Sequence, residues 1–131
     1  MKKLIMGLAL LTSMSAFAGG LEDCKSLIGT YSCKYQGQEL ELKISKNSAL
    51  NSVKISIAGD AQDLIVDGTA HKSGNDDSVN VAECNAKKEI VADNFFKNEL
   101  KGSFAITKTA EGARYTMVQN RNSVVLDCTK K

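Results

Sequence analysis

Apolar and polar residues alternate with a period of two in one short segment after another from residue 31 to the end of the chain. The alternation is clear in residues 31–35, 40–44, 53–57, 79–81, 104–106, 115–117 and 124–128, where Val79 and Val81 are the apolar members of the fourth segment. This periodicity predicts β-strands with one buried face and one solvated face. Such strands usually pair antiparallel, because parallel strands are usually buried on both faces.

Turn residues separate these segments at short and regular intervals. Asp67-Gly68 is a typical two-residue hairpin signal, and residues 73–78 form a longer polar loop. The other turns are Gln36-Gly37, Gly59-Asp60, 110–112 and 120–122. Eight or nine short strands result, which predicts an all-β fold: a small antiparallel up-and-down β-barrel of about eight strands.

The segment 87–100 fits two structures. Its apolar residues would form one helical stripe, with Asn85 as the N-cap, which corresponds to a short helix near 86–97. Alternatively, it contains two strands joined by a turn at Asp93-Asn94. We favour strands, because the neighbouring segments are strands and β-branched residues open the stretch.

Residues 1–18 read as a signal peptide. Lys2 and Lys3 precede an apolar run, and Ala16-Phe17-Ala18 supplies small residues at a cleavage site. The run is shorter than the ~20 residues that span a bilayer, so we expect no stable membrane insertion. We therefore expect a periplasmic or secreted protein in which residues 19–131 form a single domain.

Removal of the signal peptide changes the charge balance. The chain has 17 Lys and Arg residues against 15 Asp and Glu residues, and the loss of Lys2 and Lys3 leaves 15 of each. A neutral domain gives no electrostatic reason to expect nucleic acid as a partner. We expect a monomer whose partner is a small ligand or an extracytoplasmic protein.

The four cysteines are Cys24, Cys33, Cys84 and Cys128. An even number in a small exported domain predicts two disulfides. No two cysteines are close enough in sequence for a zinc site, so we expect no metal. Cys33 and Cys128 share the phase of the apolar residues in the first and last strands, which are neighbours in a closed barrel. This favours Cys33–Cys128 with Cys24–Cys84, although the two other pairings remain open.

Residues suited to catalysis are sparse. His71 is the only histidine, with Asp67 and Asp76 as its nearest acidic candidates in sequence, and there is no G-x-S-x-G motif. Asp76-Asp77 lies in a polar loop that turn formation explains. We therefore expect neither catalytic residues nor a cofactor.

Four aromatic residues are candidates to line a cavity: Tyr31, Tyr35, Phe104 and Tyr115. A small barrel either fills its interior with side chains or holds one small ligand, and the low aromatic content favours a filled core. The stretch Leu27-Ile28-Gly29-Thr30-Tyr31 resembles the start of lipocalin-like and avidin-like barrels, with Tyr31 where those families usually have Trp. The resemblance implies a small closed barrel with a ligand cavity.

A second resemblance is to periplasmic inhibitors of c-type lysozyme, small exported β-barrels with a Tyr-x-Cys motif and a Ser-Gly-x-x-Tyr loop. This chain has Tyr31-Ser32-Cys33 and, later, Gly112-Ala113-Arg114-Tyr115, with Glu111 where the family has Ser. The resemblance implies an inhibitory loop formed by Glu111, Gly112, Arg114 and Tyr115.

Together these features predict an exported, non-enzymatic protein that binds a small molecule, a glycan or a protein partner. The alternative is a protein inhibitor of a cell-wall hydrolase of the lysozyme type, or of a protease.

Overall fold

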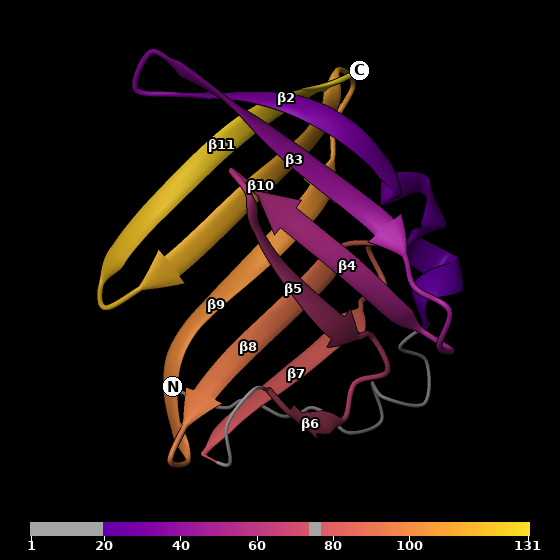
Figure 1. Ribbon diagram of the computed structural model, residues 1–131, viewed down its shortest axis with the longest axis vertical. Helices are drawn as coiled ribbons and strands as arrows, with labels where there is room; N and C mark the ends of the chain where they lie inside the picture. The colour runs from indigo at the N-terminus through magenta and orange to yellow at the C-terminus, as the bar shows by residue number, and fades with distance from the viewer. Residues whose placement is uncertain (1–19, 74–76) are drawn as a thin grey trace.

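The computed structural model describes residues 20–73 and 77–131, and its fold is all-β (Figure 1). The predicted signal peptide and Asp76 lie outside these ranges. One short 3₁₀ helix precedes ten strands. The elements are η1 (Leu21–Leu27), β2 (Gly29–Tyr35), β3 (Gln38–Lys46), β4 (Ser52–Ile57), β5 (Asp60–Ile65), β6 (Ala70–Lys72), β7 (Ser78–Cys84), β8 (Ile90–Phe96), β9 (Glu99–Lys108), β10 (Gly112–Gln119) and β11 (Asn122–Lys130).

All ten strands belong to one sheet that curls into a nearly closed barrel. The strand order is β5-β4-β3-β2-β11-β10-β9-β8-β7-β6, and neighbouring strands are antiparallel. The barrel closes where Val66, which directly follows the edge strand β5, forms a parallel bridge with Ala82 of β7, the neighbour of the other edge strand β6. The predicted antiparallel barrel is therefore confirmed. The strand count was too low, because the three-residue strand β6 carries no alternation that the sequence reveals.

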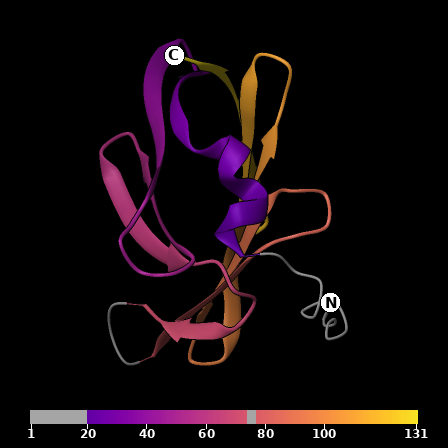
Figure 2. The same ribbon diagram turned by 90° about the vertical axis from the view of Figure 1, so that its right-hand side faces the viewer.

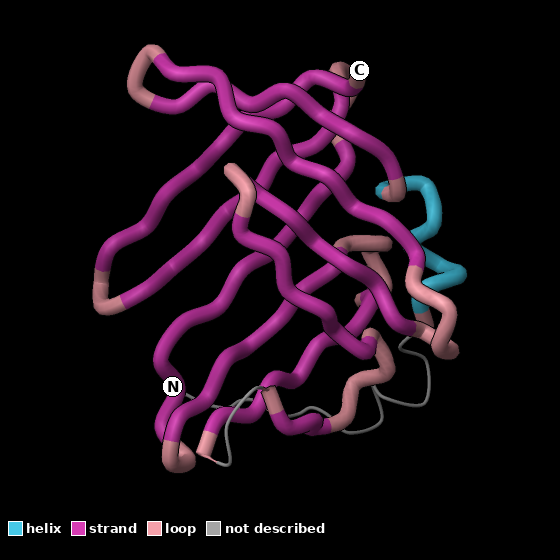
Figure 3. The backbone as a smooth tube through the Cα atoms, in the orientation of Figure 1, coloured by secondary structure: helices cyan, strands magenta, loops and turns pink. Residues whose placement is uncertain are grey.

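Four two-residue turns connect the hairpins, and both residues of each turn have positive φ. Asn120-Arg121, for example, has φ values of 51° and 70°. The other three are Gln36-Gly37, Ala58-Gly59 and Lys97-Asn98. Such turns match the right-handed twist of the strands that they join. They appear in Figure 3 as the short pink links at the ends of the strands.

The prediction of a hairpin at Asp67-Gly68 is wrong. The turn leads from β5 to β6, but β5 pairs with β4, and β6 pairs with β7. Gly68 has a φ of 78°, and its N–H donates to the carbonyl oxygen of Ala82 at 2.8 Å. The Asp-Gly pair thus carries the chain across the closure of the barrel.

Residues 90–96 and 99–108 are strands, so the favoured prediction of two strands is confirmed and the alternative of a helix near 86–97 is wrong. The predicted position of the turn is also wrong: Asp93-Asn94 lies within β8, and the chain turns at Lys97-Asn98, where both residues have positive φ. The helix that the structure does have is η1. Leu21, Cys24 and Leu27 are buried along it at intervals of three, which is the repeat of a 3₁₀ helix. Figure 2 shows η1 beside the barrel, between the β3–β5 side and the β8–β10 side.

The two disulfides are Cys24–Cys84 and Cys33–Cys128, as the strand phases favoured. Cys33 and Cys128 are directly opposite one another in the β2–β11 ladder, with their Cα atoms 4.1 Å apart. That ladder has only three residue pairs, so the disulfide reinforces a short seam. The second disulfide attaches η1 to the end of β7.

Candidate functional site

The registers of β7 to β11 align the inward-facing residues in rows that cross five strands. One row contains Cys84, Ile90, Ile106, Tyr115 and Leu126, and the next contains Ala82, Ala92, Phe104, Met117 and Val124. The third row, which we call the amide row, contains Asn80, Asn94, Gly102, Gln119 and Asn122. The interior of this half of the barrel therefore changes from apolar to uncharged polar within one row.

The amide row lies near one end of the barrel, where β7, β9 and β11 begin and β8 and β10 end. In Figure 1 these strand ends extend to the lower left, past β4 and β5. The first four residues of β5 are exposed, so this end of the barrel is open to solvent on the β5 side.

A cavity of about 220 Å³ lies between the amide row and the row beneath it. Ala92, Phe104, Tyr115 and Met117 line its apolar part, and Gln62 of β5 borders it from the opposite edge of the sheet. Small residues leave the space: Ala92 lies in the second row, and Gly102 interrupts the amide row. A Cβ on Gly102 would lie 3.1 Å from the carbonyl oxygen of Val118, so the close approach of β10 keeps this position free of a side chain.

The amides around the cavity have unused hydrogen-bonding capacity. Asn94 Nδ2 donates to Asn80 Oδ1 at 2.5 Å, and Asn80 is only 9% exposed. The amide nitrogen of Asn80 donates to no atom of the described residues, and neither Gln62 nor Gln119 makes a side-chain hydrogen bond to them. Since a buried donor without a partner costs about 1–3 kcal/mol, Asn80 has a strong preference for a polar ligand or a water molecule beside it.

Tyr115 adds a hydroxyl to the same cavity. Its ring stacks on that of Phe104, with centroids 5.5 Å apart and an interplanar angle of 19°. Burial raises the pKa of Tyr115, so the hydroxyl stays protonated and can donate a hydrogen bond. Within the described residues its hydrogen-bond acceptor is Met117 Sδ at 4.0 Å, a weak acceptor.

Charge is nearly absent from the cavity wall. Two charged residues border the cavity, Asp93 and Lys101. Asp93 lies between the inward-facing Ala92 and Asn94, so the alternation of β8 places its side chain on the outer face. Lys101 Nζ lies 3.0 Å from Glu99 Oε1, which balances its charge. The site therefore favours an uncharged ligand.

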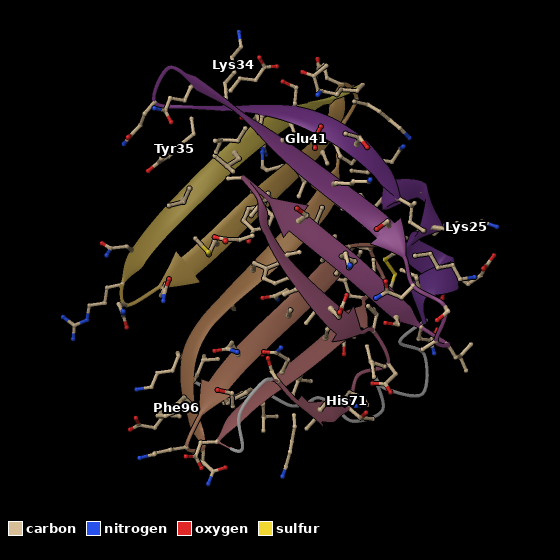
Figure 4. All side chains as sticks on the ribbon, in the orientation of Figure 1. Lys25, Lys34, Tyr35, Glu41, His71 and Phe96 are labelled. Atoms are coloured by element: carbon tan, nitrogen blue, oxygen red, sulfur yellow. A yellow bond between two sulfur atoms is a disulfide. The ribbon has the colours of Figure 1, made fainter. Side chains whose placement is uncertain are left out.

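Two of the four aromatic residues predicted to line a cavity do so, namely Phe104 and Tyr115. The other two lie elsewhere in the fold. Tyr31 is 1% exposed, and its hydroxyl donates to the carbonyl oxygen of Leu27 at 2.7 Å, so it joins β2 to η1. Tyr35 is exposed at the β2–β3 hairpin, at the opposite end of the view from Phe96 (Figure 4).

The four residues of the proposed inhibitory loop do not share one exposed surface. Glu111 is exposed in the turn before β10, whereas Gly112 is buried where the strand begins. Arg114 is exposed, and its Nε lies 2.7 Å from Asp127 Oδ1 on the outer face. Tyr115 points into the barrel and is 7% exposed. Arg114 and Tyr115 therefore point to opposite faces of β10.

His71 lies in β6 beside Asp67, one of the two acidic residues that the sequence suggested as possible neighbours of this histidine. Its Nε2 is 3.0 Å from Asp67 Oδ2 and 3.0 Å from Thr69 Oγ1, so one ring nitrogen faces both groups. Burial by itself would raise the pKa of Asp67, but hydrogen bonds from Thr69 and His71 outweigh it, and the pKa is lowered. These contacts span five consecutive residues and fix the turn between β5 and β6.

Sequence reasoning missed the amide row because it placed the wrong residues of β7 in the core. Val79 and Val81 look like the buried face, yet Asn80, Ala82 and Cys84 are the buried residues. One signal was available: a disulfide-bonded Cys84 at an inward position fixes the phase of the strand and brings Ala82 and Asn80 inward with it.

Comparisons with known proteins find no match to a protein-family model, to a curated protein or to a solved structure. Within the described ranges, no helix has the length and apolar character needed to cross a membrane.

Proposed function

We propose that this chain is an exported, non-enzymatic binding protein that holds a small uncharged polar molecule at the open end of the barrel. The observation that carries the proposal is the amide row above an apolar cavity. Asn80 is nearly buried there and has an amide nitrogen without a partner among the described residues. A ligand that accepts this hydrogen bond removes the cost of the unsatisfied donor.

The size and polarity of the site restrict the ligand. A cavity of about 220 Å³ is smaller than the roughly 300–1,000 Å³ that drug-sized ligands occupy. Amide side chains both donate and accept hydrogen bonds, so they suit hydroxyl or amide groups better than ions. Phe104 and Met117 provide contact for the apolar part of such a molecule.

Two features support the proposed location, the disulfides and the sequence of residues 1–18. Two disulfides fit an oxidising compartment outside the cytoplasm. The signal-like sequence of residues 1–18 supports delivery to the periplasm or the medium by a cleaved signal peptide.

The test is an NMR titration of the ¹⁵N-labelled protein with uncharged compounds of four classes: sugars, polyols, neutral amino acids and nucleosides. We expect one class to shift the amide signals of Asn80, Asn94 and Gly102. The variant Gln62→Ala should weaken binding at least fivefold, because it removes a polar group from the cavity wall. Gln38→Ala is the matched control, since Gln38 is an exposed strand residue away from the cavity.

Two results would reject the proposal. One is the absence of saturable shifts with every class at millimolar concentrations. The other is a ligand whose shifts centre on residues outside the cavity and whose affinity is the same in Gln62→Ala and in wild type.

A further inference from the structure

The amide row continues beyond the cavity described above. A second cavity, of about 150 Å³, lies on the β10–β11 hairpin and is lined by Met117, Gln119, Asn120, Asn122 and Val124. Met117 and Gln119 border both cavities, so the two are adjacent. We call the pair the amide groove. It extends across strands β7 to β11, because its polar residues come from one row of the sheet.

The two cavities have the same construction. Each has part of the amide row along one side, and each has residues of the second row beneath it: Ala92 and Phe104 in the first cavity, Val124 in the second, and Met117 in both. Adjacent strands are ~4.8 Å apart, so the amides of β7, β8, β10 and β11 lie along the groove at multiples of this distance, with a gap at Gly102 of β9. A ligand that fits must therefore repeat its own polar and apolar groups.

The amide groups along the groove have spare donors and acceptors. Gln119 and Asn122 make no side-chain hydrogen bond to the described residues, and the amide nitrogen of Asn80 is also without a partner among them. An amide can bind two neighbouring hydroxyls, one through its oxygen and one through its nitrogen. Sugar rings carry hydroxyls around their edges and C–H groups on their faces, which match the amide row and the apolar row respectively.

We propose that the amide groove binds an uncharged oligosaccharide, with one sugar ring in each cavity. This inference rests on the proposed function, because the first cavity is the site proposed there. A charged glycan fits less well: the only cation bordering the groove in the described residues, Lys101, is already paired with Glu99. A peptide with ionic side chains also fits less well, because the charged residues that border the groove are Lys101, which is paired with Glu99, and Asp93, whose side chain is on the outer face.

The test compares glucose and N-acetylglucosamine with their linear trisaccharides by isothermal titration calorimetry. We expect at least one trisaccharide to bind ten times more tightly than its monosaccharide, since it occupies both cavities. Trigalacturonate, a charged trisaccharide, should bind at least tenfold more weakly than the preferred neutral one.

Two variants separate the cavities. Asn122→Ala changes only the second cavity, so it should weaken the trisaccharide about fivefold and leave the monosaccharide unchanged. Gln62→Ala changes only the first, so it should weaken both ligands. Both side chains are exposed, so neither substitution disturbs the core, and Gln38→Ala serves as the control.

The outcomes distinguish this inference from the proposed function. If a monosaccharide, an amino acid or a nucleoside binds at the first cavity and no trisaccharide binds more tightly, the oligosaccharide inference is wrong and the proposed function stands. If nothing binds, both are wrong. Co-sedimentation with insoluble cellulose and chitin shows where the bound sugar chain comes from. If the protein sediments with the polysaccharide, its ligand is a polysaccharide chain; if it binds trisaccharides but stays in solution, its ligand is a free oligosaccharide. Both results support the proposed chemistry.

Discussion

The two disulfides should contribute almost equally to stability, although the loops that they close differ in length. Taken alone, Cys24–Cys84 closes a loop of 60 residues and Cys33–Cys128 one of 95. The loop-entropy relation gives about 4.3 and about 4.7 kcal/mol for these lengths. The loops interlock, however, because Cys33 lies between Cys24 and Cys84 and Cys128 lies outside them.

This interlocking shortens the effective loops. When one disulfide is intact, the shortest loop that the other closes passes through the intact bond. It contains the nine residues between Cys24 and Cys33 and the 44 residues between Cys84 and Cys128. Both disulfides then close a loop of about 53 residues, and each is worth about 4 kcal/mol. The packing lost on replacement is also similar, because all four cysteines are at most 3% exposed.

The assay is urea unfolding monitored by circular dichroism, with a stabilising osmolyte at constant concentration. It compares two double variants, Cys24→Ala/Cys84→Ala and Cys33→Ala/Cys128→Ala. We expect each variant to lose about 4 kcal/mol of unfolding free energy, a large part of the about 5–15 kcal/mol of a typical domain. Hydrogen exchange should increase in η1 for the first variant, and in β2 and β11 for the second. A loss below about 2 kcal/mol in either variant, or a difference above about 2 kcal/mol between them, would refute the interlocked-loop reasoning.

Three further predictions concern single residues. Tyr31→Phe should lower the unfolding free energy by about 1–3 kcal/mol in urea unfolding, because the carbonyl oxygen of Leu27 loses a buried donor; an unchanged stability would mean that this hydrogen bond does not form. Arg114→Ala should change stability by less than about 1 kcal/mol, since its ion pair with Asp127 is exposed; lysozyme inhibition by the wild type that this variant lacks would favour the inhibitor hypothesis. The lowered pKa of Asp67 stabilises the folded state above the usual Asp range, and this stability is lost as the pH falls through the lowered pKa. Melting temperatures measured between about pH 7 and about pH 2 should therefore show the wild type losing its advantage over Asp67→Asn, and a constant difference would contradict this.

The sequence predicted the barrel because strand formation here depends on local patterns. Alternation in residues 31–35 and 124–128 identified the first and last strands, and the phases of Cys33 and Cys128 within them favoured the disulfide that the structure has. Both predictions needed only the period of two and the fact that a closed up-and-down sheet brings its ends together.

The site was beyond this reasoning because it depends on register between strands. Asn80, Asn94 and Gln119 are separated by 14 and 25 residues in the chain, and only the ladders of β7 to β10 bring them into one row. Valine has a high strand propensity on either face, so Val79 and Val81 gave no reliable indication of which side of β7 is buried. The position of Asp67-Gly68 failed for a related reason, since a turn signal does not say which strands the turn brings together.

The interlocked cysteines also determine how the chain would be oxidised during the proposed export. When a chain emerges from a membrane with its N-terminus first, Cys24 and Cys33 are outside well before Cys84, and Cys128 comes last of the four. The first pair available to an oxidant is therefore one that the folded protein does not contain. Neither native bond can form until most of the chain has crossed, so correct pairing depends on delay or on reshuffling by thiol–disulfide exchange. We therefore expect a host strain without disulfide isomerase to accumulate the Cys24–Cys33 form.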